Sequence, residues 1–181
     1  MKKTILMFGV ISGLISAAFM SATVPFIDNL EHGAKGLVVG YTGMVLAFLL
    51  IYFGIRSYRE NYGGGVISFW RGFVIGLSIT VLSSLFYVVT WEVIFFKFMP
   101  HFMDGYAAHA VDAARAAGKS AAQVAALQQQ MDTYIHNPLA NGAMTFIEPF
   151  PVGLLMTLIS AGILRRKAPV EPTGAVEAAS V

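Results

Sequence analysis

Four long stretches that carry almost no charge dominate this chain of 181 residues. They cover residues 4–27, 36–55, 72–96 and 138–164. A helix that crosses a bilayer needs about 20 mostly apolar residues, and each stretch reaches that length. We therefore predict an all-α integral membrane protein with four transmembrane helices.

The composition supports this class and excludes others. Hydrophobic residues make up 56% of the chain and charged residues 12%, whereas about a quarter of the residues are charged in a soluble domain. The net charge is +2, and the basic residues do not gather in one run, so we expect no nucleic-acid partner. The chain has no cysteine, which excludes disulfides and thiolate metal sites.

The basic residues indicate how the four spans are oriented. Lysine and arginine are enriched in cytoplasmic loops, and eight of them fall on the side of the two termini, against four on the other side. The eight are Lys2, Lys3, Arg56, Arg59, Arg71, Arg165, Arg166 and Lys167, and the four are Lys35, Lys97, Arg115 and Lys119. We therefore predict a multi-pass protein of the bacterial inner membrane with both termini in the cytoplasm.

The first stretch has a second interpretation, as a cleaved signal peptide. Lys2 and Lys3 resemble the basic n-region of a signal peptide, and Ser21 and Ala22 are small residues of the kind found at a signal-peptidase cleavage site. The apolar core of a signal peptide is about 7–15 residues long, however, and this stretch is longer. A retained span is the preferred interpretation.

Residues 101–137, between the third and fourth spans, are polar and rich in alanine. A first helix is predicted over residues 104–117 and stops at Gly118, and Ser120 with Gln123 has the pattern of a capping box that opens a second helix. This region is predicted to be an extracytoplasmic helical hairpin within a four-helix transmembrane domain, residues 1–167. Residues 168–181 are too poor in large apolar side chains to fold and are predicted to be a disordered cytoplasmic tail.

Pairs of glycines four residues apart recur in the spans. Such pairs let helix backbones approach closely in lipid, although glycine is also common in membrane spans for other reasons. The residues that we predict to pack helices are Gly9, Gly13, Gly36, Gly40, Gly72 and Gly76.

Two glutamates, Glu92 and Glu148, lie near the outer ends of the third and fourth spans. With a helical rise of ~1.5 Å per residue, Glu92 lies roughly 31 Å beyond Arg71 and Glu148 roughly 25 Å beyond Arg165, so both reach a similar depth. An ionisable residue inside a span is a functional candidate because burying a charge in lipid is costly. If the two carboxyl groups meet in an apolar site, they would share a proton or hold a cation.

Pro149 and Pro151 follow Glu148 directly and are predicted to break the fourth span, since proline removes a backbone hydrogen bond inside a helix. A broken helix must face protein or a wet cavity, which favours an inward position for Glu148. The structural alternatives are that Glu148 accepts hydrogen bonds from Asn141, from Thr145 or from backbone groups freed by the prolines, and that Glu92 snorkels to the interface or pairs with Lys97. We take Glu92, Glu148, Asn141 and Thr145 as a candidate intramembrane polar site.

Other polar residues match no catalytic or metal-binding motif. His101, His109, His136, Asp104 and Asp112 have spacings that fit none of the metal motifs, and a solvated polar face is the expected role of this region. The chain also has no nucleophile motif and no phosphate loop. We therefore predict no catalytic residue, no metal and no cofactor.

Three segments are similar to a known family. They are the residues 63–69 before the third span, with sequence GGGVISF, the residues 98–106 after it, with sequence FMPHFMDGY, and the residues 137–139 followed by 148–153, with sequences NPL and EPFPVG. Over residues 2–167 the chain resembles the domain of unknown function 4199 family of small bacterial membrane proteins. The resemblance implies an integral membrane protein with this span pattern and no assigned activity, so no site residue is carried over.

Three functional classes are considered for this sequence. The first is a non-enzymatic packing or interaction protein, whose partners are the lipid bilayer and a second copy or another membrane protein. The alternative is a small transporter or ion-coupled permease that uses Glu92 and Glu148. An intramembrane enzyme using the same carboxylates is a third class, and it lacks a recognisable set of partner residues.

Overall fold

The computed structural model describes residues 1–26, 34–99 and 102–166. Its long helices are α1 (Lys2–Thr23), α3 (Ala34–Tyr62), α4 (Phe69–Val93), α7 (Pro138–Ile147) and α8 (Pro149–Leu164). Four helical segments are long and apolar enough to cross a membrane, the last formed by α7 and α8 together. This confirms the prediction of an all-α protein with four spans. The predicted tail, residues 168–181, lies outside the described residues.

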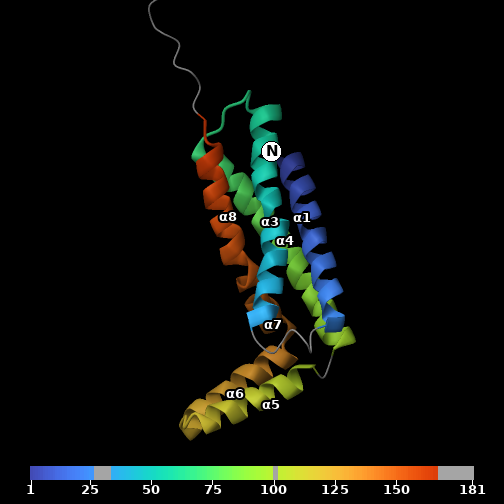
Figure 1. The fold of residues 1–181 in the computed structure, drawn as a ribbon, viewed down its shortest axis with the longest axis vertical. Helices are drawn as coiled ribbons and strands as arrows, with labels where there is room; N and C mark the ends of the chain where they lie inside the picture. Colours follow the sequence, from blue (N-terminus) through green and yellow to red (C-terminus); the bar gives the residue numbers. More distant parts are fainter. Residues whose placement is uncertain (27–33, 100–101, 167–181) are drawn as a thin grey trace, which may run out of the picture.

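The four spans form a bundle with α4 near its centre (Figure 1). Helix α4 packs between α1 and α8, α3 packs on the other side of the same two helices, and α3 also touches α4 across the bundle. Figure 1 shows the start of α1, the loop between α3 and α4, and the end of α8 at one end of the bundle. The segment between α4 and α7 lies at the other end.

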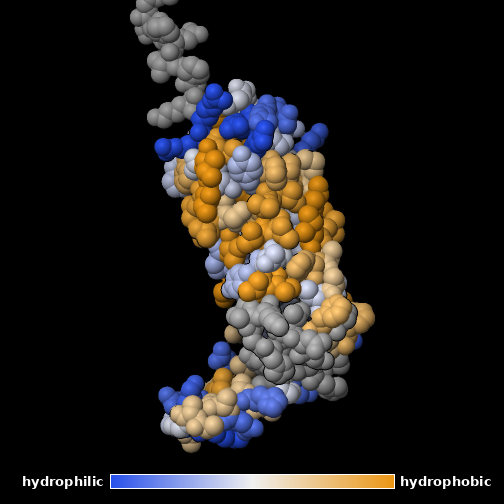
Figure 2. All heavy atoms as spheres, in the orientation of Figure 1, coloured by the Kyte–Doolittle hydropathy of each residue, from blue (hydrophilic) through white to orange (hydrophobic). Residues whose placement is uncertain are grey.

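The core of the bundle is built from side chains of three helices. Phe48 and Ile51 of α3, Ile75 and Ile79 of α4, and Leu164 of α8 are almost fully buried and pack together. Large apolar side chains elsewhere on the helices point outward, and Figure 2 shows them as a hydrophobic band between two hydrophilic ends. A band of this kind fits a lipid environment.

Helix α3 continues past the end of its predicted span, from residue 55 to Tyr62. Arg56 and Glu60, one turn apart, form an ion pair of 3.0 Å on its surface, and such pairs stabilise helices. Charge therefore ends the apolar run without ending the helix. Two short segments flank the other helices: a 3₁₀ turn, η1 (Val24–Phe26), follows α1, and a π-helical segment, η2 (Ile94–Phe98), extends α4.

A small clamp closes the end of the bundle that carries the termini. Ile67 and Arg166 form an antiparallel bridge, with N···O distances of 3.1 and 2.9 Å between their backbones. The guanidinium group of Arg59 donates to the backbone oxygen of Leu164 at 3.3 Å. Gly64 and Gly65 precede the bridge with φ of +59° and +82°, a conformation that favours glycine.

Between α4 and α7, helices α5 (Phe102–Ala116) and α6 (Ala121–His136) pack against each other. Val111 and Ala114 of α5 meet Val124 and Leu127 of α6. The predicted capping box is confirmed, because Ser120 Oγ accepts from the backbone of Gln123 at 3.3 Å and the Gln123 side chain accepts from the Ser120 backbone at 3.0 Å. Figure 1 shows this helix pair, the hairpin, projecting sideways from the bundle.

Candidate functional site

A set of polar and aromatic side chains lies where the bundle meets the hairpin, and we call it the junction. It combines residues of α4, α6 and α7 with the residue that separates α7 from α8. Its members are Tyr87, Trp91, Glu92, Tyr134, Asn141, Thr145 and Glu148.

Tyr134 of α6 attaches the hairpin to the bundle through three contacts. Its hydroxyl accepts a hydrogen bond from Trp91 Nε1 at 3.2 Å. Its ring meets that of Phe95 edge to face, with 5.9 Å between the ring centroids. Its backbone oxygen accepts from Asn141 Nδ2 at 3.2 Å. The last helical turn of α6 is therefore tied to both α4 and α7.

The turn from α6 into α7 is set by its own residues. Asn137 Oδ1 accepts from the backbone of Leu139 at 3.0 Å and of Ala140 at 3.2 Å, which caps the start of α7. Pro138 occupies the first helical position, where its missing N–H costs no hydrogen bond. This short connection places Asn141 next to the last turn of α6.

Asn141 and Thr145 lie together inside the structure. Asn141 is fully buried and Thr145 nearly so, and Thr145 Oγ1 donates to Asn141 Oδ1 at 3.4 Å. The amide of Asn141 thus uses both its donor and its acceptor, as a buried polar group requires. Neither residue donates a hydrogen bond to Glu148, whose partner is Tyr87.

Glu148 connects α7 to α8 and accepts a hydrogen bond from Tyr87 of α4. The distance from Tyr87 Oη to Glu148 Oε2 is 3.1 Å. Helix α7 ends at residue 147 and α8 begins at Pro149, with Pro151 two positions later. The backbone of Glu148 keeps helical angles, φ −64° and ψ −57°, so the chain changes helix here without a reversal.

Glu92 faces α7 at Gly142. A methyl group added at Gly142 would lie 3.4 Å from Glu92 Oε1. This oxygen is buried and has no hydrogen-bond partner among the described residues. No ion pair joins it to Lys97 in that part of the chain either, and Lys97 is exposed. Glu92 is therefore the junction residue whose polar group is least satisfied.

The structure places the two glutamates at the same end of the bundle with different neighbours. Tyr87, the partner of Glu148, and Glu92 are five residues apart on α4, which corresponds to about 140° around a helix. No hydrogen bond between the described residues joins the two carboxyl groups. Chemically, the junction offers a carboxylate held by a tyrosine hydroxyl and a separate, half-buried carboxyl group with one buried oxygen.

Hydroxyl groups join the helices in the middle of the bundle, at positions that sequence analysis did not single out. Ser12 Oγ of α1 donates to the backbone oxygen of Ala47 at 2.9 Å and lies 3.0 Å from Ser83 Oγ of α4. Thr80 of α4 and Thr157 of α8 share a hydrogen bond of 3.1 Å. Such bonds hold transmembrane helices together.

Four of the six glycines proposed for packing lie at contacts between helices. A methyl group added to Gly9 or Gly13 would meet Leu82 or Phe86 at 2.7 and 2.5 Å, and Gly72 and Gly76 of α4 face α8.

The other two glycines differ. Gly40 is exposed, and an added methyl group would find no atom within 4 Å, because it lies on a face of α3 that no described helix covers. The surroundings of Gly36 lie outside the described side chains. Further contact glycines that periodicity did not reveal are Gly43, Gly54 and Gly153.

The sequence of this chain matches a known protein family. A family model described as "Protein of unknown function (DUF4199)" matches residues 7–166. The chain belongs to this family. No curated protein and no solved structure matches it. The match spans all four helical segments, the hairpin and the junction.

In this DUF4199 protein, sequence analysis identified the acidic and amide members of the junction but not its aromatic ones. Among the described residues, the side-chain hydrogen bonds that link different helices there join Tyr87 to Glu148, Trp91 to Tyr134, and Asn141 to the backbone oxygen of Tyr134. One signal was available, since Tyr87 and Trp91 are four residues apart and share a helix face. Both are apolar rings with a polar tip, which suits the boundary between lipid and water.

Proposed function

We propose that this protein is a non-enzymatic protein of the bacterial inner membrane that acts by associating with another protein. In this proposal the bundle is a rigid membrane base and the hairpin is the contact surface outside the membrane. The observation that carries it is the projection of the hairpin away from the bundle, held at the junction through Tyr134.

The properties of the hairpin support this role. Among its described side chains, those of Val111, Ala114, Val124 and Leu127 pack together as a core, and most of the others are exposed. Helices of about 15 residues are marginal in water without tertiary packing. A hairpin with so small a core gains stability when a partner covers it.

The interior of the bundle supports the role of a base. Its buried hydroxyl groups bond largely to one another and to backbone, as Ser12 does with Ser83 and Thr80 with Thr157. Its glycines receive large side chains of neighbouring helices. Both features favour a closely packed scaffold.

Site-specific photo-crosslinking in cells tests the proposal. A photoreactive residue at Ala113 or Ala125, exposed on the hairpin, should give discrete adducts with another protein. The same residue at Leu46 or Leu155, on the outer surface of the spans, is the control and should give lipid adducts. Protein adducts from the spans alone, or none from the hairpin, would contradict the proposal.

A second candidate function is transport of a proton or cation through the junction. It is favoured by one observation, the buried Glu92 Oε1 without a hydrogen-bond partner among the described residues, because an unsatisfied carboxyl oxygen can take up a proton or cation. This transport is measured as the flux of protons or cations into liposomes that contain the protein. Transport by the parent that is lost in Glu92→Gln and Glu148→Gln, but kept in Glu60→Gln at the opposite end, would establish this candidate and displace the first.

A further inference from the structure

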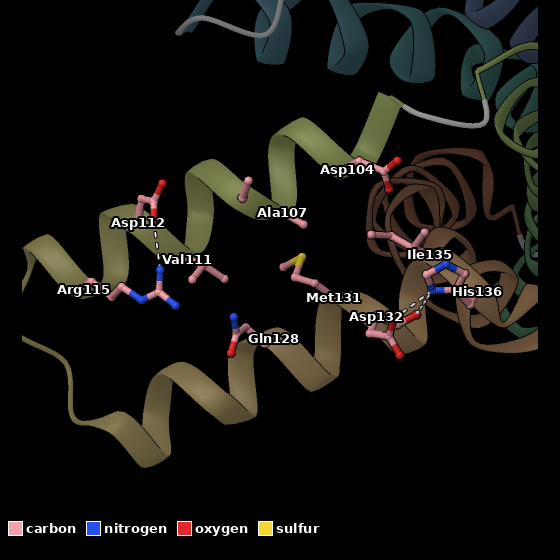
Figure 3. Close-up of a pocket in the computed structure, with 11 residues that line it drawn as sticks. Asp104, Ala107, Val111, Asp112, Arg115, Gln128, Met131, Asp132, Ile135 and His136 are labelled. Carbon is pink, nitrogen blue, oxygen red and sulfur yellow. Dashed lines mark hydrogen bonds and ion pairs between the residues drawn. The ribbon is translucent and has the colours of Figure 1, made fainter.

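An open groove of about 390 Å³ runs between α5 and α6, on the hairpin (Figure 3). Its floor is apolar and is formed by Ala107 and Val111 of α5 and by Met131 and Ile135 of α6. Val111 is 6% exposed and Ile135 9%, and the side chain of Ala107 is small. The groove above these residues therefore has room for large side chains of a partner.

The rim of the groove is acidic. Asp112 and Asp132 supply two carboxylates, and Arg115 supplies one guanidinium group. Asp112 pairs with Arg115 at 3.2 Å and Asp132 with His136 at 3.0 Å, and all four of these side chains are more than half exposed. His136 adds charge only when it is protonated. The rim thus presents negative charge around an apolar floor.

We infer that this groove binds a third helix, from another protein, that is amphipathic and basic. Its apolar side chains would cover Val111 and Ile135, and its lysine or arginine residues would face Asp112 and Asp132. A third helix would complete a three-helix bundle and enlarge the small core that α5 and α6 form among their described side chains. This inference rests on the proposed function and specifies the chemistry of the partner.

Charge excludes two other occupants. The hairpin of a second copy would bring the same two aspartates, Asp112 and Asp132, to the rim, and like charges repel. The surface of an anionic bilayer would be repelled in the same way. A basic helix is the occupant that satisfies both the floor and the rim.

The binding test uses the full chain in nanodiscs of zwitterionic lipid. The probe is a fluorescently labelled synthetic helix of 18 residues with leucine on one face and lysine on the other, and its matched control carries glutamate in place of lysine. Binding to empty nanodiscs is subtracted. The lysine helix should bind at least tenfold more tightly than the glutamate helix, and its affinity should fall as salt rises, because exposed charges are screened.

Two pairs of variants locate the binding. Ala107→Phe fills the floor and should weaken binding at least fivefold, whereas Ala113→Phe, on an exposed part of α5 outside the groove, should not. Asp132→Lys reverses a rim charge and should weaken binding of the lysine helix and improve binding of the glutamate helix. Gln130→Lys, on α6 but outside this groove, is its control.

The outcomes separate this inference from the proposed function. Equal binding of the two probe helices, or equal effects of Ala107→Phe and Ala113→Phe with unchanged circular dichroism, would overturn the third-helix site. If hairpin crosslinks to another protein persist in cells, the proposed function stands without it. Absence of hairpin crosslinks in the parent protein would overturn the proposed function itself.

Discussion

Individual glycines in this bundle act by giving space to one large side chain of the neighbouring helix. Gly13 receives the ring of Phe86, and Gly76 receives Thr157 and Ile51. A methyl group at Gly76 would lie 2.8 Å from Thr157 Cγ2 and 3.0 Å from Ile51 Cγ2. Lipid offers no hydrophobic compensation when helices are pushed apart, so these contacts contribute directly to stability.

Gly76→Leu should therefore destabilise the protein. Overpacking a closely packed site costs about 1–3 kcal/mol, and the change also disturbs the hydrogen bond between Thr80 and Thr157. We expect a lower melting temperature in detergent. Gly40→Leu is the matched control, because Gly40 has open space around it, and it should leave the melting temperature nearly unchanged. Similar effects of the two substitutions would argue against the contact role of Gly76.

At this scale, the sequence predicted which glycines share a helix face, but not what each face contacts. A spacing of four residues places glycines on one face of a helix, but it does not say whether that face meets a helix or lipid, and Gly40 lies on an open face. The depth of Glu92 and Glu148 followed from helical rise. Their partners did not, since Tyr87 and Gly142 are brought to them by packing between α4 and α7.

At the scale of the helix, the attachment of the hairpin depends on the last turn of α6. Hydropathy predicted the spans, and the capping box predicted the start of α6. The sideways direction of the hairpin depends instead on long-range contacts of Tyr134, in the last turn of α6, with Trp91 and Phe95. No local pattern in residues 101–137 encodes those contacts.

Tyr134→Ala should loosen the hairpin while the bundle stays folded. The substitution removes the hydrogen bond from Trp91 Nε1 and the ring contact with Phe95, and a typical hydrogen bond contributes about 0.5–1.5 kcal/mol. Amide hydrogen exchange should rise in α5 and α6 and stay unchanged in α4. Thr133→Ala, which removes only a bond to the backbone of Gln129, is the control. Unchanged exchange in the hairpin would mean that Tyr134 does not hold it.

On the scale of the whole molecule, the clamp between Ile67 and Arg166 joins the loop after α3 to the chain beyond α8. It connects segments about 100 residues apart in the sequence through two backbone hydrogen bonds. It lies next to the domain boundary that the change in composition at Ala168 predicts.

Truncation should reveal this boundary. A chain that ends at Lys167 keeps both bridge residues and should melt at the temperature of the full protein. A chain that ends at Leu164 loses Arg166 and the two bonds, which are worth about 1–3 kcal/mol together, and should melt earlier. An equal loss of stability in both truncations would place the boundary within residues 168–181.

The whole molecule is expected to lie in the membrane with both termini on the cytoplasmic side. The amino terminus, the loop between α3 and α4 and the end of α8 share one end of the bundle, and eight lysine and arginine residues belong to that end in the sequence. Since basic residues favour the cytoplasmic side, a reporter that works only in the cytoplasm should be active when it is fused after Lys167. A reporter that works only after export should be active when it is inserted between residues 116 and 122, in the turn of the hairpin. The reverse pattern would place the groove in the cytoplasm, and its basic partner would then have to be a cytoplasmic protein.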